Sequence, residues 1–202
     1  MQSPSPTTTE LLVEIRQDTQ RVLSYVRDLS NPNVSAAINI LQKVLRDPLT
    51  KLPNRQAFSQ RASELSTSNI PYVIGLLDLD HFKEINNTMG HAKGDELLVI
   101  VASAIESQLS SADIVARLGG DEFVAIYRNT PPESVSNLLT ALMSALPPTA
   151  TAAGFPAITA SGGVSSDRNE PGDLKLRDAD NAMYEAKAEA VSRLPASLAE
   201  GY

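Results

Sequence analysis

The stretch Arg117-Leu-Gly-Gly-Asp-Glu-Phe123 contains two glycines that are directly followed by two acids. Apolar, β-prone runs lie on both sides of this motif. A Gly-Gly pair between such runs (residues 113–118 and 123–127) predicts a β-hairpin with the glycines at its tip. Side chains alternate between the faces of a strand, so Asp121 and Glu122 cannot both be buried in one core. Glycine lets a ligand approach the backbone closely, and paired acids beside it indicate a metal site. Taken alone, such a motif is more often a surface turn with solvated acids.

The composition fits one domain of about 150 residues with an extension, because the chain has 202 residues and is 42% hydrophobic. It contains no cysteine, which excludes disulfides, thiolate chemistry and Cys-zinc sites. No segment approaches the ~18 consecutive apolar residues of a membrane span. The amino-terminal residues lack the basic region and apolar core of a signal peptide, so we expect a cytoplasmic protein.

The charge balance limits the partners. The formal net charge is −7, from 24 acidic and 17 basic residues, and no basic stripe offsets it. This argues against a double-stranded nucleic acid as partner. A small anionic substrate would need a divalent cation and a few local lysines or arginines.

The amino-terminal region, residues 1–46, predicts a disordered start followed by two helices, at about residues 9–29 and 34–46. The first helix shows heptad-like spacing at Leu12, Ile15, Val22, Val26 and Leu29. Two interpretations stay open, because the helices could pack on the main domain or pair with a second chain as a dimerising stalk.

The remainder of the chain alternates predicted helices and strands, which indicates an α/β sheet with helices packed on it. The helices are expected after Asn54-Arg55, from Asp95 to about Leu109, from Ser134 to Leu146, where Pro147-Pro148 should end the helix, and from Leu174 to about Val191; the strands are expected at Tyr72–Asp78, on both sides of Gly119-Gly120 and at Ile158–Val164.

Asp78 ends the predicted central strand, where ligands gather in open α/β sheets. If the hairpin pairs beside that strand, Asp78 and Asp121 meet. Two carboxylates and a backbone carbonyl, with waters and phosphate oxygens, are how proteins usually hold Mg²⁺.

Polar residues that could bind a nucleotide follow Asp78. Lys83 enters a helix and could contact phosphate, although a solvated helical lysine is the commoner case. Asn86 and Asp95 suit a guanine edge, because the carboxylate accepts from the ring N1–H and the exocyclic amine. Asp95 fits equally well as a helix N-cap.

These residues belong to motifs through which the chain, from about Asp47 to Val191, resembles the GGDEF-domain family of diguanylate cyclases. The motifs are Asp47-Pro-Leu-Thr-Lys-Leu-Pro-Asn-Arg55, Asp78-Leu-Asp-His-Phe-Lys-Glu-Ile-Asn86 with Gly90-His-Ala-Lys-Gly-Asp95, Gly119-Gly-Asp-Glu-Phe123 and Ala179-Asp-Asn-Ala-Met-Tyr-Glu-Ala-Lys187. The resemblance implies an α/β (α+β) domain at residues 47–193, with a central, mostly antiparallel five-stranded sheet surrounded by helices as in nucleotidyl cyclases, and a tail at residues 194–202.

The family condenses two GTP molecules into cyclic di-GMP and two pyrophosphates, as a symmetric dimer with Mg²⁺ or Mn²⁺. The resemblance implies roles that fall into three groups. The metal ligands are Asp78, Asp121 and the Leu79 carbonyl; the catalytic residues are Asp121, Glu122 and Lys83; the substrate contacts are Asn86, Asp95, Phe82, Gly119, Gly120 and Lys187.

Two departures from the family pattern stand out. Ser110 replaces the arginine of the Arg-x-x-Asp product-inhibition motif that ends at Asp113, so we expect product inhibition through this site to be absent or weak. After Lys187, Val191 stands where the family carries a phosphate-binding arginine. Arg193 could take over that contact only from the next part of the helical turn. Losing one such contact costs roughly 1.5–3 kcal/mol of binding free energy.

Three functional hypotheses remain at this point. The first is an active diguanylate cyclase, the second an inactive domain that binds GTP and regulates a partner, and the third a cyclase that also accepts ATP. The sequence names no input signal, and an upstream sensor partner could act through residues 1–46.

Overall fold

The computed structural model describes residues 44–165, 175–177 and 179–184, and the elements below belong to the compact unit that begins at Arg46. The predicted amino-terminal helices, Lys187, Val191, Arg193 and the tail at 194–202 lie outside the described residues.

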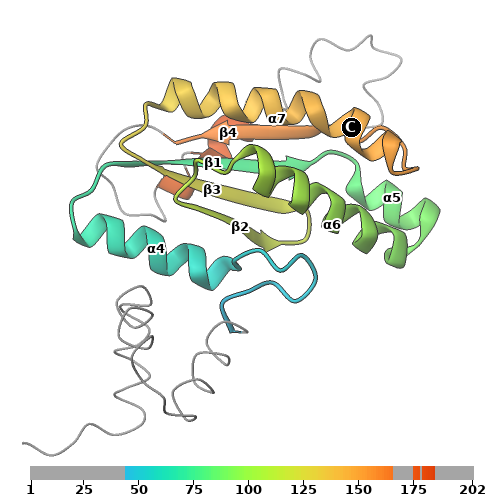
Figure 1. Cartoon of the computed structure of the whole chain (residues 1–202), viewed down its shortest axis with the longest axis horizontal. Coiled ribbons are helices and arrows are strands. Elements are labelled where there is room, and N and C mark those ends of the chain that lie inside the picture. Colours follow the sequence, from blue (N-terminus) through green and yellow to red (C-terminus); the bar gives the residue numbers. More distant parts are fainter. Residues whose placement is uncertain (1–43, 166–174, 178, 185–202) are drawn as a thin grey trace, which may run out of the picture. The chain divides into compact units, whose positions relative to one another are not determined.

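An antiparallel sheet with the strand order β2-β3-β1-β4 forms the centre of the unit (Figure 1). Its strands are β1 (Tyr72–Leu79), β2 (Ile114–Gly119), β3 (Glu122–Arg128) and β4 (Ala160–Val164). The mixed α/β architecture is therefore confirmed, but the described residues form four strands instead of five. Within residues 44–165, 175–177 and 179–184, the chain beside β2 makes a single bridge, from Asn54 to Arg117, because Pro53 has no N–H with which to extend the ladder.

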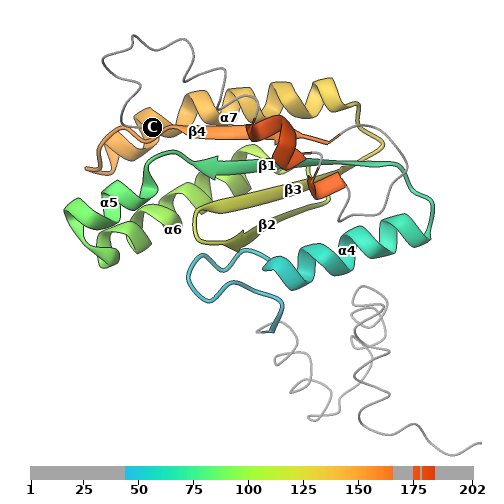
Figure 2. The same ribbon diagram turned by 180° about the vertical axis from the view of Figure 1, so that it is seen from behind.

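Helices cover both faces of the sheet, which explains why β1 is a continuous apolar run. Val73 and Leu77 face a core shared with α6 (His91–Gln108) and α7 (Pro132–Ala152), seen in front of the sheet in Figure 1. Ile74 and Leu76 face α4 (Arg55–Thr67) and the helical residues 175–177 and 179–184, seen in Figure 2. The predicted central strand is thus confirmed, since β1 lies between β3 and β4.

Helix starts follow local capping chemistry in one case and depart from the prediction in another. The helix expected after Asn54-Arg55 is present, and Asn54 caps it, because the Asn54 side chain accepts hydrogen bonds from the N–H groups of Gln56 and Ala57 at 3.0 and 3.1 Å. Helix α5 (Phe82–Met89) is joined to α6 by Gly90, which has a φ of 86°. Asp95 is not an N-cap, because α6 begins at His91.

The predicted end of α7 at Pro147-Pro148 is wrong, and so is its predicted start at Ser134, because neither residue bounds the helix. The helix begins at Pro132, where proline fits the first turn, and continues through both later prolines to Ala152. Its buried stripe extends past the prolines, because Leu146 and Ala150 are both buried. Packing of this stripe outweighs the two main-chain hydrogen bonds that the prolines remove.

No helix among the described residues combines the length and apolarity that a membrane crossing requires.

Candidate active site

The glycine hairpin forms as predicted and leaves open space at its tip. Gly119 pairs with Glu122, so Gly120 and Asp121 make the turn. Gly119 and Gly120 have φ values of 144° and 52°, a region that favours glycine. A Cβ at either glycine would meet no atom of the described residues within 4 Å. Both glycines are therefore required by the backbone, and a ligand could approach them closely.

The hairpin lies directly beside the end of the central strand. Asp78 on β1 is paired with Glu122 on β3, so their side chains are on the same face. The N–H of Leu79 donates to the Asp121 carbonyl at 3.4 Å. The pairing of hairpin and central strand that the sequence predicts is confirmed, and it brings the three acids to one end of the sheet.

Negative charge concentrates around Glu122. The pKa of the Glu122 carboxyl is raised above its ordinary value, mainly by burial. The Arg55 guanidinium lowers this pKa, but the carboxylates of Asp78, Asp121 and Asp180 add to the increase. Arg55 lies on α4, with Nη2 at 3.4 Å from Glu122 Oε2, and its Nε donates to the Leu118 carbonyl. Sequence reasoning assigned no role to Arg55 or Asp180, although both lie in the quoted motifs; nothing local predicts that they approach Glu122.

A second arginine fixes the hairpin tip. Arg117 donates from Nε and Nη2 to the Gly120 carbonyl at 2.9 and 2.7 Å, and from Nη1 to Asp47 at 2.9 Å. Burial alone would raise the pKa of Asp47, but hydrogen bonds from Thr50 and Arg117 outweigh it and lower the pKa. The turn that carries Asp121 is therefore tied to the chain before α4.

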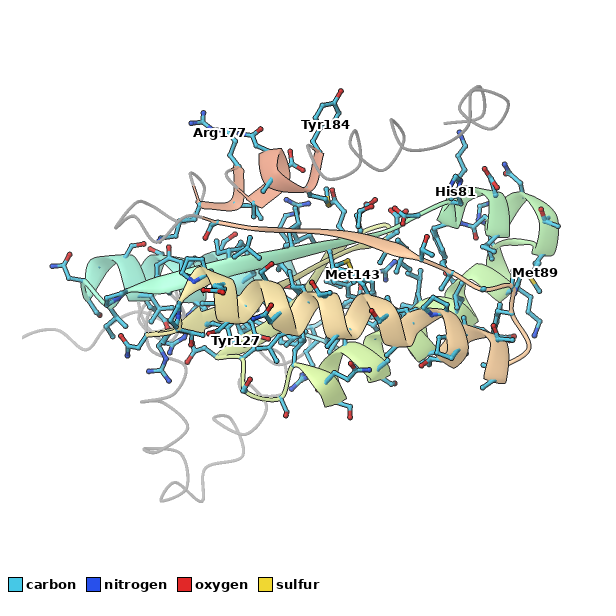
Figure 3. All side chains as sticks on the ribbon, turned by 90° about the horizontal axis from the view of Figure 1, so that it is seen from above. His81, Met89, Tyr127, Met143, Arg177 and Tyr184 are labelled. Atoms are coloured by element: carbon cyan, nitrogen blue, oxygen red, sulfur yellow. The ribbon has the colours of Figure 1, made fainter. Side chains whose placement is uncertain are left out.

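The loop after β1 has a defined conformation. Both carboxylate oxygens of Asp80 are engaged, by the Thr159 and Ser161 hydroxyls at 2.8 and 2.7 Å. His81 has a φ of 58° and precedes α5, above which its ring is seen in Figure 3. Lys83 is exposed on the first helical turn, whereas the Phe82 ring is buried in the core. Any substrate contact of Phe82 would therefore come from its main chain.

Asn86 and Asp95 lie on neighbouring helices. Asn86 is half-buried near the end of α5, and Asp95 is exposed in the second turn of α6. Within the part of the chain that the structure describes, neither side chain forms a hydrogen bond or an ion pair, so both keep their capacity to bind a ligand.

Asp113, the remaining aspartate of the inhibition motif, is already engaged. Its side chain is 7% exposed and forms ion pairs with Arg61 of α4 and with Arg128 at the end of β3. This carboxylate ties α4 to the far end of the hairpin.

Asp78 near the end of β1 and Asp121 in the adjacent hairpin turn offer carboxylate oxygens of the kind that bind Mg²⁺. Among residues 44–165, 175–177 and 179–184, no group of three or more His, Cys, Asp or Glu side chains is arranged to hold a metal ion. This absence does not conflict with the predicted Mg²⁺ site, because that site uses only two carboxylate side chains. Its other ligands would be carbonyl, water and phosphate oxygens.

Comparison with known proteins agrees with this geometry. Residues 44–193 match the family model described as diguanylate cyclase, GGDEF domain. The chain therefore belongs to the GGDEF-domain family.

The diguanylate cyclase DgcP of Pseudomonas aeruginosa is 39% identical over 166 residues, which cover 76% of this chain but only 24% of DgcP. A crystal structure of the diguanylate cyclase SiaD from Pseudomonas aeruginosa with its activator SiaC matches with a TM-score of 0.69 and 30% identity, over 90% of this chain and 70% of SiaD. The coiled coil and GGDEF domain of DgcB from Caulobacter crescentus, in complex with c-di-GMP, matches with a TM-score of 0.67 and 25% identity, over 91% of this chain and 96% of that one.

Proposed function

We propose that this chain is a diguanylate cyclase that condenses two GTP molecules into cyclic di-GMP and two pyrophosphates. The observation that carries the proposal is the antiparallel pairing of Asp78 with Glu122, together with the hydrogen bond from Leu79 to Asp121. Matches to proteins named diguanylate cyclases support it.

The 3′-hydroxyl of each GTP attacks the α-phosphorus of the other, a new O–P bond replaces the bond to pyrophosphate, and the hydroxyl proton passes to the Glu122 carboxylate and from there to solvent. Asp78, Asp121 and the Leu79 carbonyl would hold Mg²⁺ or Mn²⁺, which neutralises the triphosphate and the developing charge. Glu122 accepts a hydrogen bond from the 3′-hydroxyl, and Lys83 and Lys187 contact phosphate. Asn86 and Asp95 bind the guanine edge, and the open tip at Gly119 and Gly120 admits ribose and phosphates.

One domain binds one GTP, so two domains must face each other in a symmetric homodimer. Residues 1–46 would form its stalk, where an upstream sensor or activator could act. The coiled coil in the matching DgcB structure and the activator in the SiaD complex support this arrangement. We place the activity in the cytoplasm, where GTP is available.

The purified full chain, incubated with GTP and Mg²⁺, should form cyclic di-GMP with two pyrophosphates for each product. Asp121→Asn should lose at least about a hundredfold in turnover, because it removes a charged ligand of the metal that would neutralise the reacting phosphates, and should keep its thermal unfolding midpoint. An equal mixture of GTP and ATP should yield the guanine product alone.

The alternative is an inactive domain that binds GTP and regulates a partner. It is favoured by Val191, which stands where the family carries a phosphate-binding arginine. Tight GTP binding by the wild-type chain without any cyclic product would establish the alternative and reject the cyclase.

A further inference from the structure

Gly94 is a costly residue at its position in α6. Its φ is not positive, so the helix does not need glycine for its backbone conformation. Alanine is the better helix former, because glycine gives up more conformational freedom in a helix. A reason for glycine at this buried position must therefore come from its neighbours.

The space that a side chain at Gly94 would take is filled by Asn86. A Cβ built on Gly94 would lie 3.0 Å from Asn86 Cγ, 3.2 Å from Phe82 Cζ and closer still to Asn86 Oδ1. Atoms do not approach a Cβ so closely without a shift. Gly94 thus leaves a notch on α6 that receives the carboxamide of Asn86.

The backbone around this notch is fixed. Gly90 alone joins α5 to α6, its N–H donates to the Asn86 carbonyl at 2.9 Å, and the Gly94 N–H donates to the Gly90 carbonyl at 3.1 Å. The carboxamide itself forms no hydrogen bond within the described residues. Its orientation therefore depends on packing against Gly94.

We propose that Gly94 is a positioning residue for base recognition, because its missing side chain lets the Asn86 carboxamide pack against α6 at the residue just before Asp95. The inference rests on the proposed function, in which Asn86 and Asp95 bind guanine. Gly94 does not touch the nucleotide and acts only through Asn86.

The substitution Gly94→Ala separates this role from a structural one. Most of the clash is with the end of a flexible side chain, which can rotate away, while the Phe82 ring shifts by a few tenths of an ångström. The melting temperature should therefore stay close to that of the wild type, and the preference for GTP over ATP should fall about tenfold, as expected for one lost hydrogen bond to the base.

The test is calorimetric binding of the α,β-methylene triphosphates of guanosine and adenosine to the full chain with Mg²⁺. The variants are Gly94→Ala, Asn86→Ala and the double variant, each with a thermal unfolding curve. Gly75→Ala is the matched control, since its Cβ would meet Leu139 and Val135 at 3.1 and 3.2 Å in the core of the sheet. It should lower the melting temperature and leave the nucleotide preference unchanged.

If Gly94 acts through Asn86, the double variant should match Asn86→Ala within about twofold, because coupled residues are not additive. If the losses of nucleotide preference in the two single variants multiply in the double variant, the role assigned to Gly94 is wrong. An unchanged preference in Gly94→Ala would also overturn that role, and either result would leave the proposed function standing. If Gly94→Ala fails to fold, adding Asn86→Ala should restore folding, and failure to do so overturns the assignment too. A wild-type chain with no preference for the guanosine analogue overturns both this inference and the proposed function.

Discussion

Tyr127 has a buried hydroxyl with no hydrogen-bond partner among the residues described. Its side chain lies in the core between the sheet and α7 (Figure 3), and burial raises the pKa of its phenol to about 12. An unsatisfied buried polar group costs about 1–3 kcal/mol of folding free energy.

We expect Tyr127→Phe to stabilise the chain by about 1 kcal/mol in urea unfolding, because it removes this hydroxyl. Tyr72→Phe is the matched control, since the Tyr72 hydroxyl bonds Ser66 at 2.9 Å, and its loss should destabilise by about as much. Equal destabilisation in both variants would contradict the prediction.

The same residue has a consequence at alkaline pH. The unfolded phenol ionises near its ordinary pKa of 10.0, whereas the folded phenol keeps its proton until about 12. The unfolded state therefore binds fewer protons in this window, and Tyr127 makes stability fall as pH rises from 10 towards 12. Unfolding curves across this range should show a smaller decline in Tyr127→Phe than in the wild type.

At the scale of elements, β4 lies between α7 and the helical residues 179–184, and the second helix lies closer to the strand than α7 does. A Cβ on Gly163 would lie 2.5 Å from the Met183 backbone nitrogen and closer still to the Ala179 carbonyl, so the helical residues 179–184 cross β4 in backbone contact. On the other face, a Cβ on Gly162 would lie 3.2 Å from the Leu76 carbonyl and 3.3 Å from Met143, a side chain seen beside α7 in Figure 3.

Gly163→Ala should therefore displace the helix that carries Asp180, because a Cβ only 2.5 Å from its backbone forces that helix to move, whereas the Leu76 carbonyl lies 3.2 Å from a Cβ at Gly162 and needs to shift only slightly. We expect a loss of at least about 2 kcal/mol in stability and of most activity, while Gly162→Ala should cost about 1 kcal/mol or less. Hydrogen exchange in residues 179–184 would detect the displacement. Similar exchange in both variants would show that the close crossing does not matter.

The sequence predicts elements correctly where local signals agree. The glycine tip, the helix after Asn54 and the apolar β1 run each depend on neighbours in sequence, and each is confirmed. The end of α7 was missed because packing of Leu146 and Ala150 overrides the local effect of proline. Likewise, the approach of Arg55 and Asp180 to Glu122 joins segments far apart in the chain, and no local pattern contains it.

At the scale of the whole molecule, the proposed reaction needs two active sites that face each other. We expect deletion of residues 1–43 to reduce product formation at low protein concentration, because two domains without a stalk meet less often. Raising the concentration should recover much of the loss, and ultracentrifugation should show weaker dimers. Equal activity and equal association at every concentration would contradict a dimerising role for this segment.

The ion pairs of Asp113 predict how the proposed cyclase responds to its product. With Ser110 in place of arginine and Asp113 paired with Arg61 and Arg128, little remains to bind a cyclic dinucleotide there. Calorimetry with cyclic di-GMP on the Asp121→Asn variant should show no binding in the nanomolar to low micromolar range. Binding in that range would show that this site can still take up the product and mediate product inhibition.

The most direct test of a shared cation site at Asp78 and Asp121 is to measure Mn²⁺ affinity by electron paramagnetic resonance. The titration is done in the presence of the α,β-methylene analogue of GTP, which cannot react. Asp78→Asn and Asp121→Asn should each weaken Mn²⁺ binding at least about tenfold, since each removes a charged ligand. Asp80→Asn, whose wild-type carboxylate is engaged by Thr159 and Ser161, should bind Mn²⁺ like the wild type. Unchanged Mn²⁺ affinity in both Asp78→Asn and Asp121→Asn would contradict the shared site.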